Sequence, residues 1–275
     1  MTILGTEKVE GWQAQLDLEF GLSHKKTILT QRRHSGPLTI QRPFYPEGDV
    51  CHLYILHPPG GVVASDSLTI NVQAQANSAA LITTPAATKF YRSDGATARQ
   101  TVNIKVAEGA TFEWVPQETI MYEGAKVRSD ICVELAANAR FIGWEVQVLG
   151  RPAANEGFAT GEVHLNWLIY RAEQLFYQER IKLDARAFMA RWGLNNHSAL
   201  GTLFVYPVLP AHLAAVQELI GEQSGRGVTL IDNLLICRAL DERADRLRGF
   251  FQQVWALLRP EVLQRSACEP RIWAT

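Results

Sequence analysis

The sequence predicts a mainly β protein with a few helices near its C-terminus. Apolar and polar residues alternate along most of the first two thirds of the chain, which is the pattern of half-buried strands. Short clusters of Gly, Pro, Asn and Asp separate these segments at fairly even spacing. The two observations favour a sandwich, a barrel or a β-solenoid. We see no self-similar repeat that would mark a regular solenoid.

The alternation is clearest in segments 12–20, 68–76, 101–106 and 126–135. Successive side chains of a strand point to opposite faces, so each segment presents one apolar row to a core. The residues predicted to face inward are Trp12, Ala14, Leu16, Leu18, Phe20, Leu68, Ile70, Val72, Ala74, Ala76, Val102, Ile104, Val106, Val127, Ile131, Val133 and Leu135.

The last third of the chain changes character. Segments 210–223 and 241–260 carry apolar residues at helical spacing, and segment 227–240 is typical of a strand or a strand pair. For the second helix we predict Asp241 as the N-cap and Pro260 as the stop. A short turn of helix is also expected around "ARAFMARW". We therefore expect one domain over residues 1–275, β-rich over 11–183 and mixed α/β over 184–275.

Composition excludes several classes of protein. The formal net charge is −1, which argues against a nucleic-acid binder. No apolar run is long enough to span a bilayer, and the N-terminus lacks the apolar stretch of a signal peptide. The four cysteines are widely spaced and fit buried reduced thiols, so we expect a cytoplasmic protein without a membrane partner.

The common catalytic and metal-binding motifs are missing from the sequence. It contains no G-x-S-x-G, no phosphate-binding Gly-rich loop, no H-E-x-x-H and no close Cys/His cluster. His52 and His57 fall on opposite faces if "CHLYILH" is a strand, which makes a joint metal site there improbable. An enzyme that uses two carboxylates stays open as an alternative.

Three carboxylates stand out by their position. Glu179 shares the apolar row of "LFYQERIKL", where a carboxylate must be paired with an Arg, line a polar cavity, or face solvent after all. Glu145 lies on the less apolar row of "RFIGWEVQV", which faces either water or a wet interior. Asp66 follows the Pro-Pro-Gly-Gly turn at 58–61 and either caps that turn or is presented by it. Periodicity alone does not show that the three meet.

An ordered set of motifs resembles the UreD (UreH) family of urease accessory proteins. The motifs run from about residue 11 to the C-terminus in the family's order. They are "GWQAQLDLEF", "GPLTIQRPFYPEG", "CHLYILHPPGGVVASD", "TTPAATKFYRS", "WVPQETIMYEGA", "GRPAANEGF" and "PRIW". The resemblance implies a β-helix-like, many-stranded fold with a pair of helices.

The same resemblance implies a non-enzymatic scaffold for urease maturation. Such a protein binds the urease apoprotein and UreF, and UreF recruits the nickel-carrying GTPase UreG. The resemblance also implies an internal path for Ni²⁺ lined by Asp66, Glu145 and Glu179. Because a conduit needs weak, repeated sites, we expect no tight metal site and no tightly bound cofactor.

The C-terminal tail is the expected contact for UreF. Arg271 and Trp273 are anchors by residue type, although Trp273 could instead pack back on its own domain. A β-rich binding module without any metal role is the other alternative to the maturation scaffold. Such a module would keep its function when Glu179 and Asp66 are neutralised.

Overall fold

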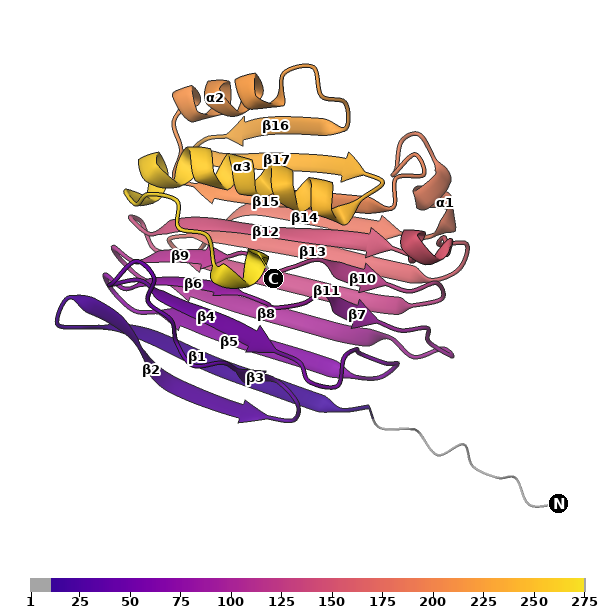
Figure 1. Cartoon of the computed structure of the whole chain (residues 1–275), viewed down its shortest axis with the longest axis horizontal. Helices are drawn as coiled ribbons and strands as arrows, with labels where there is room; N and C mark the ends of the chain where they lie inside the picture. The colour runs from indigo at the N-terminus through magenta and orange to yellow at the C-terminus, as the bar shows by residue number, and fades with distance from the viewer. Residues whose placement is uncertain (1–10, 275) are drawn as a thin grey trace.

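Two β-sheets lie face to face in the computed structural model, which describes residues 11–274 (Figure 1). In spatial order, the seven-stranded sheet consists of β14 (Gln174–Leu183), β13 (Glu162–Arg171), β11 (Lys126–Leu135), β8 (Ala98–Val106), β5 (Ser67–Ala74), β1 (Gln13–Ser23) and β2 (Lys26–Ser35). The ten-stranded sheet runs through β16 (Arg226–Ile231), β17 (Leu234–Asp241), β15 (Ala199–Tyr206), β12 (Arg140–Leu149), β9 (Thr111–Trp114), β6 (Ala79–Thr83), β4 (Cys51–Leu56) and β3 (Thr39–Ile40). Its two remaining strands are β10 (Thr119–Met121), which pairs with β12, and β7 (Thr88–Phe90), which pairs with β10.

The parallel register of the seven-stranded sheet makes the fold a solenoid. Strands β1, β5, β8, β11 and β13 pair in parallel, and between them the chain crosses to the other sheet and returns. The pairing aligns one buried apolar residue from each strand into a row: Leu16, Ile70, Val102, Ile131 and Trp167. Stacking coils in this way buries a continuous core that no single coil could form. The predicted mainly β, solenoid-like fold is confirmed.

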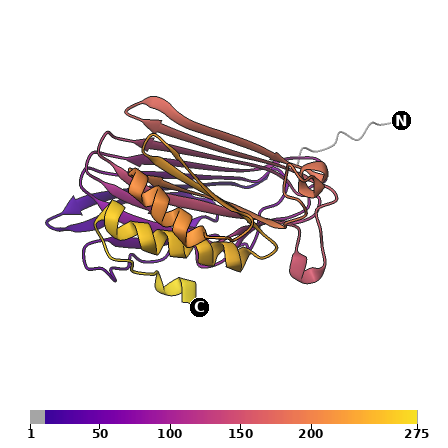
Figure 2. The ribbon, with the colours of Figure 1, turned by 90° about the horizontal axis from the view of Figure 1, so that it is seen from above.

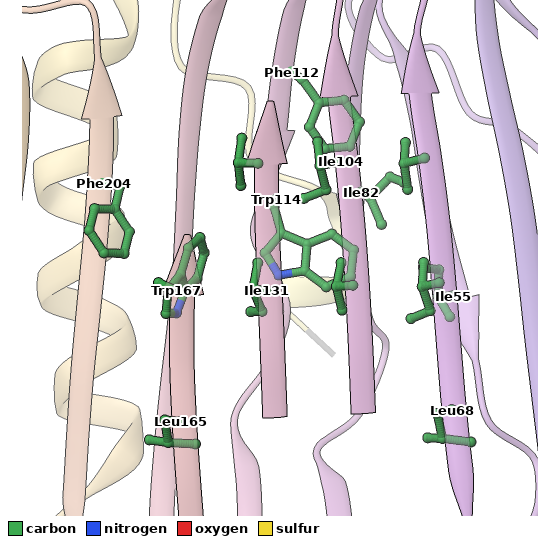
Figure 3. Close-up of a cluster of buried hydrophobic side chains, with 14 of the residues drawn as sticks. Ile55, Leu68, Ile82, Ile104, Phe112, Trp114, Ile131, Leu165, Trp167 and Phe204 are labelled. Atoms are coloured by element: carbon green, nitrogen blue, oxygen red, sulfur yellow. The ribbon is translucent and has the colours of Figure 1, made fainter. Parts of the chain in front are cut away.

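The main hydrophobic core fills the space between the two sheets. Figure 3 shows part of it, with side chains from both sheets meeting around Trp114, Ile131 and Trp167. Trp12 and Ala76, which the alternation placed in the inward-facing rows, are exposed. Each lies just beyond a strand end, at the start of β1 and after the end of β5, where the pairing that enforces the alternation stops.

A second core lies on the outer face of the ten-stranded sheet. Helices α2 (Pro210–Ile220) and α3 (Ala244–Leu263) cover this face (Figures 1 and 2). The central strand β12 is therefore buried on both sides: Trp144 packs under the helices, and Phe141 packs between the sheets. This explains why "RFIGWEVQV" has one strongly apolar row and one mixed row.

The long C-terminal helix differs from its predicted boundaries. Asp241 is the last residue of β17, and Arg243 is the N-cap, although the Asp241 Oδ1 accepts a hydrogen bond from the Arg243 N–H at 3.1 Å. Pro260 lies inside the helix, which continues to Leu263. The last turn persists because its apolar side chains are buried and because the Arg140 Nη1 donates to the Val262 carbonyl at 2.9 Å.

The smaller predictions for the last third hold. Strands β16 and β17 form the expected hairpin, and α1 (Ala185–Met189) is the expected short helix. The Asp184 carboxylate caps α1 by accepting a hydrogen bond from the Ala187 N–H at 2.9 Å. Two short 3₁₀ turns, η1 (Pro152–Ala154) and η2 (Arg271–Ala274), complete the described elements. Across residues 11–274, no helix is both long enough and apolar enough to cross a membrane.

Candidate functional site

A small cavity between the sheets brings Glu145 and Glu179 together. It has a volume of about 20 Å³ and is lined by residues of β11, β12, β13, β14 and β15. That volume accommodates a single water molecule. Glu179 comes from β14, the edge strand of the seven-stranded sheet, and Glu145 comes from β12 at the middle of the opposite sheet. Two of the three singled-out carboxylates thus share one cavity.

Glu145 is a buried carboxylate that pairs with no cationic side chain among residues 11–274. Its Oε1 accepts a hydrogen bond from the Trp114 Nε1 at 3.3 Å, and its Oε2 accepts one from the Gln147 Nε2 at 2.7 Å. Burial raises the pKa of Glu145 from its ordinary value of 4.5 to about 7, although these hydrogen bonds act in the opposite direction. Glu145 therefore exchanges its proton near neutral pH.

Glu179 is buried and held by several donors at once. Its Oε2 accepts hydrogen bonds from the Tyr177 hydroxyl at 3.0 Å and from the Arg238 Nε at 2.9 Å, and the Arg238 Nη2 lies close to the same oxygen. Its Oε1 has only a long contact of 3.4 Å with the Thr202 hydroxyl. An ion pair with an arginine and a place on a polar cavity, which were alternatives for this residue, are both present. The strand does not face solvent at Glu179.

Two more polar side chains lining the small cavity have unsatisfied atoms. The Ser129 Oγ and the Gln147 Oε1 are buried and have no hydrogen-bond partner among the residues that the structure describes. Because a buried polar atom without a partner is costly, such atoms commonly bind an internal water or an ion. The cavity thus has the chemistry of a wet site.

A second, larger cavity shares Glu145 with the small one. It has a volume of about 410 Å³, and Glu145 belongs to the lining of both cavities. Its polar lining includes His57 and Lys89, and the Pro-Pro-Gly-Gly turn contributes Pro58 and Gly60. Gly60 adopts a φ of 80°, a conformation that favours glycine, and this lets the chain turn at the cavity's rim. The Pro-Pro-Gly-Gly turn, which Asp66 follows in the sequence, therefore lines this cavity.

Asp66 itself lines neither of these two cavities. Its Oδ1 accepts a hydrogen bond from the Trp12 N–H at 2.8 Å, and its Oδ2 accepts one from the Val63 N–H at 2.9 Å. Both oxygens are therefore used by nearby backbone, as expected of a turn cap. The structure brings Glu145 and Glu179 together and leaves Asp66 apart from them.

The described part of the chain holds no cluster that would bind a metal tightly. Within residues 11–274, no group of three or more His, Cys, Asp and Glu side chains is arranged to hold an ion. His52 pairs with Glu47 at 2.7 Å and is fully buried, whereas His57 lines the large cavity. All four cysteines are free, and burial raises the pKa of Cys51 to about 11. Cys51 and Cys237 are buried as predicted, whereas Cys132 and Cys268 are only partly buried; that all four are reduced stays a prediction.

The C-terminal tail folds back onto the helix-covered core. Trp273 packs against Trp144 and Trp255 with ring centroids 5.6 and 5.5 Å apart. Its Nε1 donates to the Thr83 hydroxyl at 3.0 Å. Arg271 is exposed in the same 3₁₀ turn. Trp273 thus packs within its own domain. That Arg271 and Trp273 contact a partner protein stays a prediction.

Sequence reasoning missed the arginines that pair with the buried acids. Arg238 lies in the apolar run "LLICRAL", where one charged residue among buried neighbours was the available signal. Arg259 is four residues after Trp255, so it falls on the buried stripe of α3, where it pairs with Glu47 and Glu113. Neither pairing could be found without the fold, because the partners are far apart in the sequence.

The fold and the site define a class: a β-solenoid with two adjoining interior cavities and buried carboxylates between its sheets. The model of the UreD urease accessory protein family matches residues 13–274. The urease accessory protein UreD of Citrobacter koseri is 41% identical over 275 residues, covering 100% of this chain and 95% of its own. The UreD proteins of Alcanivorax borkumensis (40% identical; 98% of this chain and 95% of its own) and Trichormus variabilis (41%; 98% and 99%) are similar to the same degree.

The chain belongs to the UreD family of urease accessory proteins. Members of this family are non-catalytic chaperones of urease maturation and take part in nickel delivery. The expected family is thereby confirmed, and the carboxylate-pair enzyme is set aside. The buried carboxylates must accordingly be understood as structural groups or as contacts for a passing cation.

Proposed function

We propose that this chain is a cytoplasmic scaffold that binds the urease apoprotein and UreF, with UreG recruited through UreF, and that it passes Ni²⁺ through its interior. The observation that carries the proposal is the position of Glu145, which lines the large cavity and the small cavity alike. A cation that reaches the large cavity therefore meets a carboxylate at the point where the small cavity begins.

The donor set favours transit over storage. Carboxylate, amide and hydroxyl oxygens suit loose contacts with a divalent cation, whereas thiolates and several imidazoles together would trap it. Glu145, Gln147, Ser129 and Glu179 supply such oxygens around the small cavity. Weak sites in series allow an ion both to enter and to leave.

Asp66 has a different part in the proposal. Both of its carboxylate oxygens are used by backbone N–H groups, so we assign it to holding the turn that lines the large cavity. Its direct contact with nickel stays a prediction.

Cells that carry the cognate urease genes provide the test. This chain is deleted, restored, or restored as Glu145→Gln, and nickel per urease and co-purified UreF are measured together. We expect deletion to abolish nickel loading and Glu145→Gln to lower it while UreF still co-purifies. The exposed Glu222→Gln serves as the matched control.

Two results would contradict the proposal in different ways. Full nickel loading after deletion would remove the maturation role itself. Normal loading with Glu145→Gln, together with normal loading with Glu179→Gln, would leave a β-rich binding module without a metal path.

A further inference from the structure

Arg238 stands between the Glu179 carboxylate and solvent. The Arg238 side chain is 48% exposed, whereas the Glu179 side chain is only 8% exposed. Arg238 reaches from β17, in the ten-stranded sheet, to Glu179 on the edge strand of the other sheet. The half-exposed guanidinium thus pairs, from the solvent side, with a carboxylate that lines the small cavity.

The ion pair divides the two oxygens of Glu179. The Oε2 is surrounded by donors from Tyr177 and Arg238, and the Arg238 Nη2 also donates to the Tyr177 hydroxyl at 2.6 Å. The Oε1 has only the long contact with Thr202 on the cavity side. A divalent cation at this carboxylate would lie next to the guanidinium charge, and that repulsion disfavours its binding.

We propose that Arg238 is a gate: its guanidinium closes the cavity at Glu179 and must swing into solvent before a divalent cation can occupy or pass that carboxylate. The inference rests on the proposed function, because it assigns regulation to the same path. It adds a positioning residue that binds no nickel itself.

The surroundings of Arg238 allow the movement. Its pairing partner on edge strand β16 is Gly227, and a side chain built at Gly227 would meet nothing within 4 Å. Half of the Arg238 side chain already contacts solvent. Although burial lowers the pKa of Arg238, the bonds and charge of Glu179 outweigh it and raise that pKa, so loss of a proton cannot open the ion pair.

The test measures Ni²⁺ binding by equilibrium dialysis. It uses the full chain, purified with the accessory proteins that accompany it. Arg238→Gln removes the charge, and Arg238→Met is a second variant that keeps an unbranched apolar stem. We expect either substitution to raise Ni²⁺ affinity about tenfold or more, since an opposite charge beside a carboxylate commonly shifts its equilibria by at least that factor. Adding Glu179→Gln to either variant should abolish the gain.

The control is Arg243→Gln. Arg243 pairs with the surface carboxylate of Asp245 and not with Glu179, so its loss should leave Ni²⁺ affinity unchanged. Unchanged affinity in the folded Arg238 variants would overturn the gate and leave a purely structural clasp. An increase in Ni²⁺ affinity that persists when Glu179→Gln is added would also overturn the gate.

Nickel loading of urease in cells separates the two proposals. If both Glu145→Gln and Glu179→Gln leave urease fully loaded, the nickel path is refuted and Arg238 has no path to gate. If Glu179→Gln lowers loading but the Arg238 variants bind no more Ni²⁺ than the natural chain, only the gate fails.

Discussion

Glu145 is buried and accepts hydrogen bonds from Trp114 and Gln147, and it pairs with no cationic side chain in the described part of the chain. Its pKa in the folded protein, about 7, lies above the ordinary 4.5. The unfolded chain therefore loses this proton at lower pH than the folded protein. The contribution of Glu145 to stability accordingly falls as pH rises from about 4.5 to 7, and stays low above that range.

The first prediction concerns Glu145→Gln. The variant carries no ionisable group here, so it should gain stability over the natural chain at pH 8 and gain much less at pH 5. This pKa difference between the folded and unfolded chain corresponds to a change of roughly 3 kcal/mol in the free energy of unfolding between the two pH values. Chemical denaturation at both pH values measures it, with Glu222→Gln as control. Equal effects of Glu145→Gln at pH 5 and pH 8 would contradict the assignment.

The second prediction concerns Asp66. Asp66→Ala leaves the Trp12 and Val63 N–H groups without their acceptor, so it should destabilise the fold by about 1–2 kcal/mol. Asp66→Asn keeps one acceptor oxygen and should cost less. Thermal denaturation of both variants checks the order, and equal losses would show that the carboxylate is not the cap.

At the scale of single residues, the alternation of apolar and polar residues identified the buried carboxylates Glu145 and Glu179 but not the side chains that bind them. Glu179 stood out because a carboxylate interrupted an apolar row, and it is indeed buried. Glu145 lay on the mixed row of a strand that proves to be buried on both faces. Arg238 pairs with Glu179 across two sheets, and no local spacing encodes a contact of that kind.

At the scale of elements, α3 is held to the ten-stranded sheet by a buried ion cluster. The fully buried Arg259 donates to Glu113 at 3.0 Å and to Glu47 at 2.7 Å. The Trp255 Nε1 also donates to Glu113, at 2.6 Å. Burial alone would raise the pKa of Glu47, but hydrogen bonds from His52 and Arg259 hold it at about 2.

The third prediction follows from that cluster. Arg259→Ala would leave Glu113 buried without its cation, which typically costs about 3–5 kcal/mol. Arg243→Ala, at an exposed ion pair screened by solvent, should cost much less stability. Urea denaturation compares the two. Similar losses would mean that the buried cluster does not anchor the helix.

The fourth prediction separates two roles within the C-terminal tail. Trp273→Ala removes the packing against Trp144 and Trp255, so it should lower stability by roughly 2 kcal/mol. Arg271→Ala removes an exposed side chain and should leave stability unchanged while weakening UreF binding by about 1 kcal/mol or more. Denaturation and a pull-down with UreF measure the two effects, and unaltered UreF binding by the Arg271 variant would exclude it as an anchor.

Element boundaries were predictable only where local signals decide them. The alternating strands and the apolar stripe of α3 follow from side-chain periodicity. The end of α3 does not, because the burial of Val262 and Leu263 outweighs the disruption by Pro260. Tertiary contacts also move the start of that helix, since Asp241 remains paired with Ala199 as the last residue of β17.

At the scale of the whole molecule, the solenoid leaves no regular repeat in the sequence, because its coils differ in length. Ser67, Arg99, Arg128 and His164 are aligned in adjacent parallel strands, yet their spacing along the chain is irregular. Two corners share a local feature: Asn77 and Gly109, in the turns after β5 and β8, both adopt left-handed φ values. Alternation therefore predicted strands, whereas the resemblance to UreD predicted how they stack.

The solenoid architecture also explains how a wet path can exist inside a stable fold. Each coil contributes one position to every row between the sheets, so a polar side chain can replace an apolar one without breaking the backbone ladder. Glu145, Gln147 and Ser129 are such replacements, and they border the small cavity. The surrounding apolar rows keep the core intact, and packing is lost only locally, at the small cavity.

The most direct test of the nickel path is the nickel content of urease purified from cells in which Glu179→Ala replaces the natural chain. Glu222→Ala serves as control, and co-purification of UreF and urease is measured in the same lysates. We predict a clear loss of nickel per urease with the accessory complex intact. Full nickel content, or loss of the complex along with the nickel, would contradict a path through Glu179 and leave this residue a structural partner of Arg238.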